Sequence, residues 1–151
     1  MAVTRPLRAE DREAWEILWG KYNAFYGRSG PTALPDEVID VTWQRLLCSD
    51  TPVHGLVAIV NDCPVGLAHF VLHSNLIQLE QTCYLQDLYV DDAARGQRIS
   101  RALMAAIQTF CRKNGIKDMY WHTHASNARA RSLYDTVAQD TGFVVYRQRL
   151  D

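Results

Sequence analysis

The chain has 151 residues, of which 48% are apolar and 22% are charged, a composition typical of one folded domain rather than a disordered chain. Its 16 basic residues nearly balance its 17 acidic residues, which leaves a net charge of −1. No long-range field therefore favours nucleic acid or an anionic membrane, and any anion site must be local.

The four cysteines do not form a metal motif, because they are widely spaced at Cys48, Cys63, Cys83 and Cys111. We therefore expect reduced thiols and no bound metal. The N-terminus has no apolar leader, and no run approaches the ~18 apolar residues of a membrane span. These features predict a cytoplasmic protein.

The first part of the chain predicts one short strand and two helices. Residues 3–8 are partly β-branched, and Pro6 within them favours the edge of a sheet. Residues 9–26 repeat their apolar side chains at helical spacing. A second helix is expected from about Pro35, because acidic residues occupy its first turn.

The period of the apolar residues then changes to that of strands. Two apolar, β-branched runs, Val53–Val60 and Pro64–Leu72, predict a hairpin around the turn Asn61-Asp62-Cys63. A third long strand is expected at Cys83–Val90.

The last part predicts a helix over 96–113, a strand over 119–123, a helix from the N-cap Ser126 to about residue 139, and a strand over 142–150. The order β-α-α-β-β-β-α-β-α-β predicts a mixed β-sheet with helices on both faces. This is an α/β fold of the three-layer sandwich type.

The segment 84–103, YLQDLYVDDAARGQRISRAL, carries the clearest chemistry. A strand ends in an acidic turn, and an arginine-glycine step then leads into a helix. Unpaired backbone N–H groups and the positive end of the helix dipole meet there, which predicts a phosphate or pyrophosphate site. Arginines at a helix start oppose the dipole, so this cluster favours a bound anion over a bare solvated helix end.

A second motif, Asn127-Ala-Arg-Ala-Arg-Ser-Leu-Tyr134, follows about thirty residues later and is succeeded by Gly142-Phe143. The combination resembles the GNAT superfamily of acetyl-CoA-dependent N-acetyltransferases, and the resemblance covers essentially the whole chain as one domain, residues 1–151. It implies acetyl-CoA as a co-substrate and no metal. It also implies a homodimer, for which the strand expected after Gly142 offers an edge.

The resemblance implies which residues bind the cofactor pyrophosphate. The family turn reads Arg/Gln-x-x-Gly-x-Gly/Ala, and here the corresponding residues and the one that follows are Arg95, Gly96, Gln97, Arg98, Ile99, Ser100 and Arg101. Arg98 stands where the family has a glycine, and Ser100 stands where the family has glycine or alanine. If Arg98 already lies in the first helical turn, its φ is negative, the objection is only steric, and its guanidinium can add a phosphate contact.

The strand before the turn, Y-L-Q-D-L-Y-V, resembles that of the polyamine and thialysine acetyltransferase branch. By that match the backbones of Leu88, Tyr89 and Val90 contact the pantetheine arm and the thioester carbonyl. Gln86 stands where the branch has a glutamate base, and a carboxamide cannot take a proton at neutral pH. Asp87 is the nearest carboxylate, and a catalytic role and a structural role both stay open for it.

The resemblance makes Tyr134 the general acid and Asn127 a contact of the pantetheine arm. A phenol suits proton donation to a thiolate because the two pKa values are close. The alternative is that Tyr134 is a core aromatic. Deprotonation of the amine could use a water chain, or the amine could arrive neutral; candidates to anchor the water are His69, His122, His124 and Asp87.

The resemblance places the acceptor between the first two helices and the central strands. Candidate contacts there are Trp19, Tyr22, Tyr26, Arg28, Asp36, Glu37 and Asp40, and we expect Tyr22, Tyr26 and Gln86 to bind a small-molecule amine. The acetyl group would move to a polyamine, amino acid or similar amine by direct attack in a ternary complex. One alternative is a catalytically silent acyl-CoA-binding regulatory domain, and a second is a protein-lysine or protein N-terminal acetyltransferase.

Overall fold

The computed structural model describes residues 1–150, which form two compact units. The first is Met1–Trp121, and the second, smaller unit begins at His122. The single domain expected over 1–151 stays a prediction.

The first unit is built on a five-stranded sheet in the order β1-β2-β3-β4-β5. The strands are β1 Val3–Pro6, β2 Val53–Val60, β3 Cys63–His73, β4 Thr82–Val90 and β5 Asp118–Tyr120. Neighbours pair antiparallel from β1 to β4, whereas β5 runs parallel to β4, which confirms the mixed sheet. Pro6 lies in the edge strand, as expected for a residue without an N–H donor.

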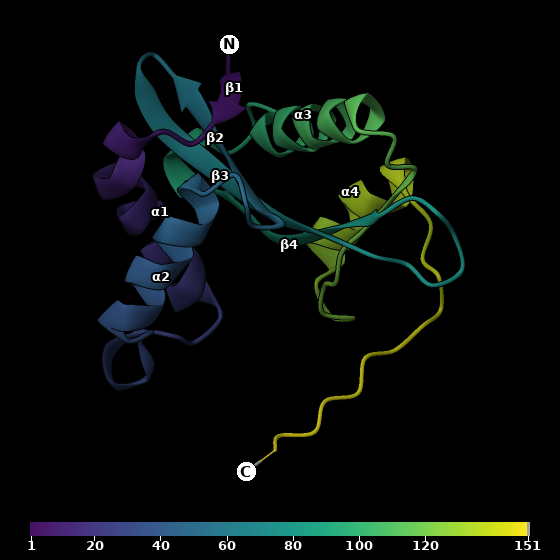
Figure 1. Cartoon of the computed structure of the whole chain (residues 1–151). Coiled ribbons are helices and arrows are strands. Elements are labelled where there is room, and N and C mark those ends of the chain that lie inside the picture. The colour runs from purple at the N-terminus through teal and green to yellow at the C-terminus, as the bar shows by residue number, and fades with distance from the viewer. Residues whose placement is uncertain (151) are drawn as a thin grey trace. The chain divides into compact units, whose positions relative to one another are not determined.

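Helices cover both faces of this sheet, as predicted (Figure 1). They are α1 Arg12–Phe25, α2 Asp36–Leu47 and α3 Ile99–Lys113, and the second unit contains α4 Ala128–Val137. Leu67 of β3 is buried in a cluster with side chains of α1 and α2. Its neighbour Gly66 points the other way, because a Cβ built there would meet Ile99 and Leu103 of α3.

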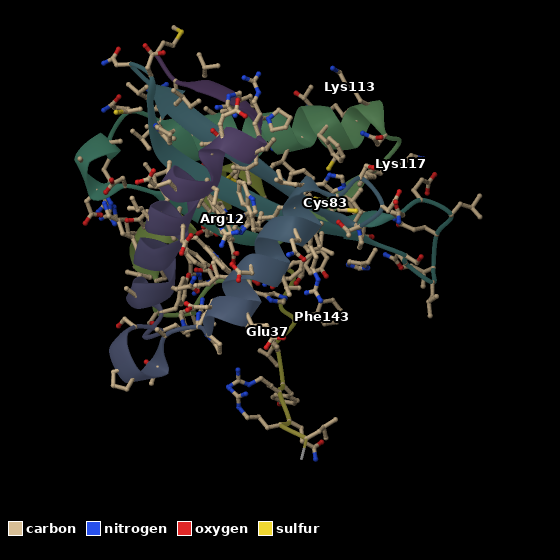
Figure 2. The ribbon with its side chains drawn as sticks, turned by 60° about the vertical axis from the view of Figure 1, so that its left-hand side comes forward. Arg12, Glu37, Cys83, Lys113, Lys117 and Phe143 are labelled. Atoms are coloured by element: carbon tan, nitrogen blue, oxygen red, sulfur yellow. The ribbon has the colours of Figure 1, made fainter. Side chains whose placement is uncertain are left out.

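A tight turn joins β2 to β3, and an ion pair joins α1 to α2. Asn61 and Asp62 have φ values of 49° and 62°, the left-handed pair that a two-residue hairpin turn requires, so β3 begins at Cys63. Arg12 of α1, which is labelled in Figure 2, forms an ion pair with Asp40 of α2. Among the described helices, none is both long and apolar enough to cross a membrane.

The final strand predicted at 142–150 is wrong. This segment contains no helix or strand, and its apolar side chains are exposed, with Phe143 89% accessible. Its β-branched and aromatic residues suit a strand, but a strand also needs a neighbour for its hydrogen bonds. No such neighbour pairs with it within residues 1–150.

Two boundaries in this part of the chain also differ from the prediction. The strand expected over 119–123 ends at Tyr120. The last helix is capped by Asn127, whose side-chain oxygen accepts from the N–H of Ala130, instead of by Ser126.

Candidate active site

The open edge of β4 is the first feature of the site. Strand β5 pairs with β4 only over Thr82–Tyr84, so beyond Tyr84 the described part of β4 is paired on its β3 side alone. Leu88, Tyr89 and Val90 lie on this open stretch. An exposed strand edge can hydrogen-bond an extended ligand, which is the contact expected for a pantetheine arm.

A β-bulge lies at the start of the open stretch. Phe70 pairs with Leu85 and His69 pairs with Asp87, so Gln86 is the extra residue on β4. Gln86 is exposed, whereas Asp87 is only 7% accessible. Bulges re-aim side chains and are frequent beside active sites, so the bulge places Gln86 and Asp87 in different environments.

Asp87 belongs to a buried hydrogen-bond network under α1. Trp15 Nε1 donates to His69 Nε2 at 2.8 Å, and His69 Nδ1 lies 2.8 Å from Asp87 Oδ2. An indole can only donate, so His69 Nε2 must be the acceptor and Nδ1 must carry the hydrogen. Trp19 Nε1 donates to the same Asp87 oxygen at 3.2 Å. His69 therefore has no ring nitrogen left to anchor a catalytic water.

Tyr22 connects this network to the bulge. Its hydroxyl donates to the backbone oxygen of Gln86 at 3.4 Å. Burial, followed by the charge of Asp87 and a hydrogen bond with it, raises the pKa of Tyr22 well above its usual value. The ring of Tyr26 lies 5.0 Å from that of Tyr22. Three predicted contacts of the acceptor, Tyr22, Tyr26 and Gln86, thus lie close together.

The start of α3 forms the second part of the site. The φ values of Gly96 and Arg98 are 83° and 57°, and the helix begins at Ile99. The first N–H with a helical acceptor is that of Ala102, which donates to Arg98 O at 3.1 Å. The N–H groups before it are therefore left for a ligand, in the curled backbone that favours anions.

The condition for a negative φ at Arg98 is not met, since this residue is the N-cap before the helix and is left-handed. A left-handed conformation costs a side chain roughly 1–2 kcal/mol, and glycine avoids that cost. The objection to arginine at this position is therefore conformational as well as steric.

After the acidic residues Asp91 and Asp92, the charged side chains at this turn are arginines. The first turn of α3 has no acidic residue, and its N-cap makes no side-chain cap hydrogen bond. Arg95 pairs with Asp92 at 2.7 Å, whereas Arg98 and Arg101 are exposed. Exposed arginines at the positive end of a helix dipole are stabilised when an anion binds.

The second unit carries the other two predicted residues. Asn127 caps α4 and its Nδ2 donates to Thr123 Oγ1 at 3.5 Å. Tyr134 is half-buried on the same helix. Their roles as cofactor contact and general acid stay predictions. His122 and His124 are exposed and lie beyond the end of β5, outside the strand expected over 119–123.

Sequence reasoning missed the partners of Asp87. The available signal was the pair Trp15 and Trp19, one turn apart on a helix that packs on the sheet, since buried indole N–H groups need acceptors. No group of three or more His, Cys, Asp or Glu side chains within residues 1–150 could hold a metal ion.

Comparison with known proteins agrees with this geometry. The sequence pattern of the Acetyltransferase (GNAT) family matches residues 12–137. The D-amino-acid N-acetyltransferase HPA3 of Saccharomyces cerevisiae is 30% identical over 148 residues, which is 97% of this chain and 89% of that protein. The uncharacterized N-acetyltransferase YhfO of Bacillus subtilis is 26% identical over 144 residues, 94% of this chain and 93% of that protein.

Solved structures show the same fold at lower identity. The aminoglycoside acetyltransferase AAC(6')-Iy, in complex with a CoA-based bisubstrate analogue, has a TM-score of 0.83 at 18% identity, and the match covers 99% of each chain. The ribosomal-protein-alanine N-acetyltransferase of Brucella melitensis has a TM-score of 0.77 at 18% identity, covering 99% of this chain and 100% of that one.

The fold and the site thus define an enzyme that transfers an acyl group from a coenzyme A thioester. The chain belongs to the Acetyltransferase (GNAT) family. It is accordingly an acetyl-CoA-dependent N-acetyltransferase with acetyl-CoA as its co-substrate.

Proposed function

We propose that the enzyme acetylates a primary amine of a small molecule by direct attack in a ternary complex. The observation that carries the proposal is the pair of binding features on one segment, the open edge of β4 and the arginine-rich start of α3. The edge suits the pantetheine arm, and the helix start suits the pyrophosphate. The acceptor would enter beside Tyr22, Tyr26 and Gln86.

The proposed reaction has one bond formed and one bond broken. The amine nitrogen attacks the thioester carbonyl, the C–N bond forms, and the C–S bond breaks to release coenzyme A as a thiolate. Tyr134 gives a proton to that sulfur, and the proton of the amine passes through water to Asp87. Asp87 suits this role because it is the carboxylate at the bulge.

Similarity supports a small acceptor. The yeast relative, which is 30% identical, acts on D-amino acids by its name, and these are small amines. The solved neighbours are named for an aminoglycoside and for a ribosomal protein, but at 17–18% identity their likeness extends to the fold alone.

We also propose a cytoplasmic homodimer. All four cysteines are free thiols, which suits a reducing compartment. The exposed apolar segment that includes Phe143 and Tyr146 offers a surface that a second copy can cover. Sedimentation at micromolar concentration tests the dimer, and a species of only ~17 kDa would contradict it.

The test of the function is thiol release from acetyl-CoA with a panel of amines. The panel contains polyamines, both enantiomers of several amino acids, an aminoglycoside, and peptides with a free lysine or N-terminus. We expect amine-dependent thiol release with at least one small amine, and a mass increase of one acetyl group on that amine. Release with the peptides alone would contradict the proposal, as would no release at all.

A further inference from the structure

Arg28 is a half-buried cation just after α1, and no carboxylate within residues 1–150 forms an ion pair with it. Its Nε donates to Asn23 Oδ1 at 2.7 Å, and its backbone N–H donates to Asn23 O at 2.8 Å. Asn23 is itself buried, at 5% accessible. One buried side chain therefore fixes the guanidinium and the backbone that carries it.

Two aromatic rings hold the same guanidinium from other directions. Arg28 Cζ lies 5.9 Å from the centre of the Tyr22 ring and 5.5 Å from that of Tyr26. Cation–π contacts of this kind favour arginine because its guanidinium is planar and weakly hydrated. Only Nε has a hydrogen-bond partner among the described residues, so the two terminal nitrogens are left as a fork of donors. Such a fork matches the two oxygens of a carboxylate.

The carboxylate of Asp87 lies at the hydroxyl end of Tyr22. The Tyr22 hydroxyl contacts the bulge, and the charge of Asp87 acts on it directly. The hydrogen-bond donors of Asp87 on α1 and β3 are all uncharged groups: the indole of Trp19, the hydroxyl of Tyr22 and the Nδ1–H of His69. No lysine or arginine within residues 1–150 forms an ion pair with Asp87, and Tyr22 contacts both this carboxylate and the guanidinium of Arg28.

We propose that Arg28 binds the carboxylate of the acceptor, so that the acceptor is a free amino acid whose amine faces the β4 bulge. A guanidinium and a carboxylate that both contact Tyr22 complement a zwitterion. A polyamine would instead bring a second positive charge to Arg28, which disfavours it. This inference rests on the proposed acetyl transfer to a small amine.

The test compares matched pairs of acceptors, an amino acid and the amine that lacks only its carboxylate, such as phenylalanine and phenethylamine. In the unaltered enzyme the amino acid should have the higher kcat/KM. Arg28→Met should raise KM for the amino acid by about 10- to 100-fold and leave KM for the amine unchanged, because a charge-assisted hydrogen bond is lost. Arg28→Lys should have an intermediate KM, since it keeps the charge and loses the fork.

Arg45→Met is the matched control, because Arg45 is an exposed arginine on α2 without an ion pair, and it should change neither KM. Equal losses on both acceptors would overturn the inference, as would an unaltered enzyme that prefers the plain amine. Unchanged affinity for coenzyme A shows that a variant is folded. If neither acceptor nor any other small amine releases thiol, the proposed function fails and not only the role of Arg28.

Discussion

Two regions flank the open end of β4, and they differ in how their polar groups are satisfied. Under α1, Trp15, His69, Asp87 and Trp19 hydrogen-bond one another, and no buried side-chain polar atom within residues 1–150 lacks a partner. At the start of α3, backbone N–H groups are unpaired and the N-cap Arg98 has a left-handed conformation. The side chains of the first region satisfy one another, whereas we propose that an anion satisfies the second. By this proposal the first region serves the acceptor and the second binds the cofactor.

The largest effect should come from Tyr134, the general acid that the family resemblance implies. Tyr134→Phe keeps the ring and removes the hydroxyl, and it should lower kcat and kcat/KM together by about 10²- to 10⁴-fold. Steady-state kinetics on a confirmed acceptor measures this. Gln86→Ala is the control and should lower kcat and kcat/KM much less, because an amide cannot serve as the base. Nearly full kcat in Tyr134→Phe would make Tyr134 a packing residue.

The network under α1 should be sensitive to the loss of its acceptor. Asp87→Ala leaves the Nδ1–H of His69 and the Nε1–H of Trp19 without partners, and it should lower the free energy of unfolding by about 3 kcal/mol. Asp92→Ala is the matched control. It removes an exposed ion pair with Arg95 and should cost under ~1 kcal/mol. Urea denaturation measures both, and equal midpoints would show that the network does not stabilise the fold.

A substitution at the start of α3 should raise the stability of the fold, whereas Asp87→Ala lowers it. Arg98→Gly relieves the left-handed arginine, and it should raise the free energy of unfolding by roughly 1 kcal/mol. The same variant should bind coenzyme A several-fold more weakly, because a phosphate contact is lost. Urea denaturation measures the free energy of unfolding, and calorimetry on the same preparation measures the affinity for coenzyme A. Tighter binding would show that Arg98 obstructs the cofactor.

The half-buried His54, which lies outside both regions, should give the smallest effect. His54 stacks on Phe70 with ring centres 5.2 Å apart, and burial lowers its pKa below the usual value. The unfolded chain therefore takes up a proton first, so stability is full above the unfolded pKa of ~6.5 and falls as pH drops below it. His54→Phe should remove this part of the pH dependence. A stability difference from the parent that is constant between pH 5 and 8 would contradict the assignment.

The sequence was sufficient for features that depend on neighbouring residues. The apolar spacing predicted α1, α2 and α3, and the alternating runs predicted β2, β3 and β4 with their hairpin. The anion-binding character of the α3 start also followed from local sequence, since it needs only a helix end without acidic residues.

Features that depend on partners far along the chain could not be predicted. The strand expected at 142–150 has suitable residues, yet pairing needs a neighbour that local sequence does not reveal. The bulge at Gln86 is a matter of register with β3, and the contact of Trp15 with His69 joins residues 54 positions apart. The left-handed φ of Arg98 could not be predicted for a related reason. The residue at which a helix begins depends on the preceding turn as well as on the sequence of the helix.

The central claim is that the start of α3 binds the pyrophosphate of the cofactor, and calorimetry with three ligands tests it most directly. Coenzyme A and dephospho-coenzyme A both carry the pyrophosphate, whereas pantetheine lacks it. We expect similar affinity for the first two ligands and at least about 30-fold weaker binding of pantetheine, the loss expected for charge-assisted hydrogen bonds to phosphate. Pantetheine binding as tightly as coenzyme A would contradict the claim.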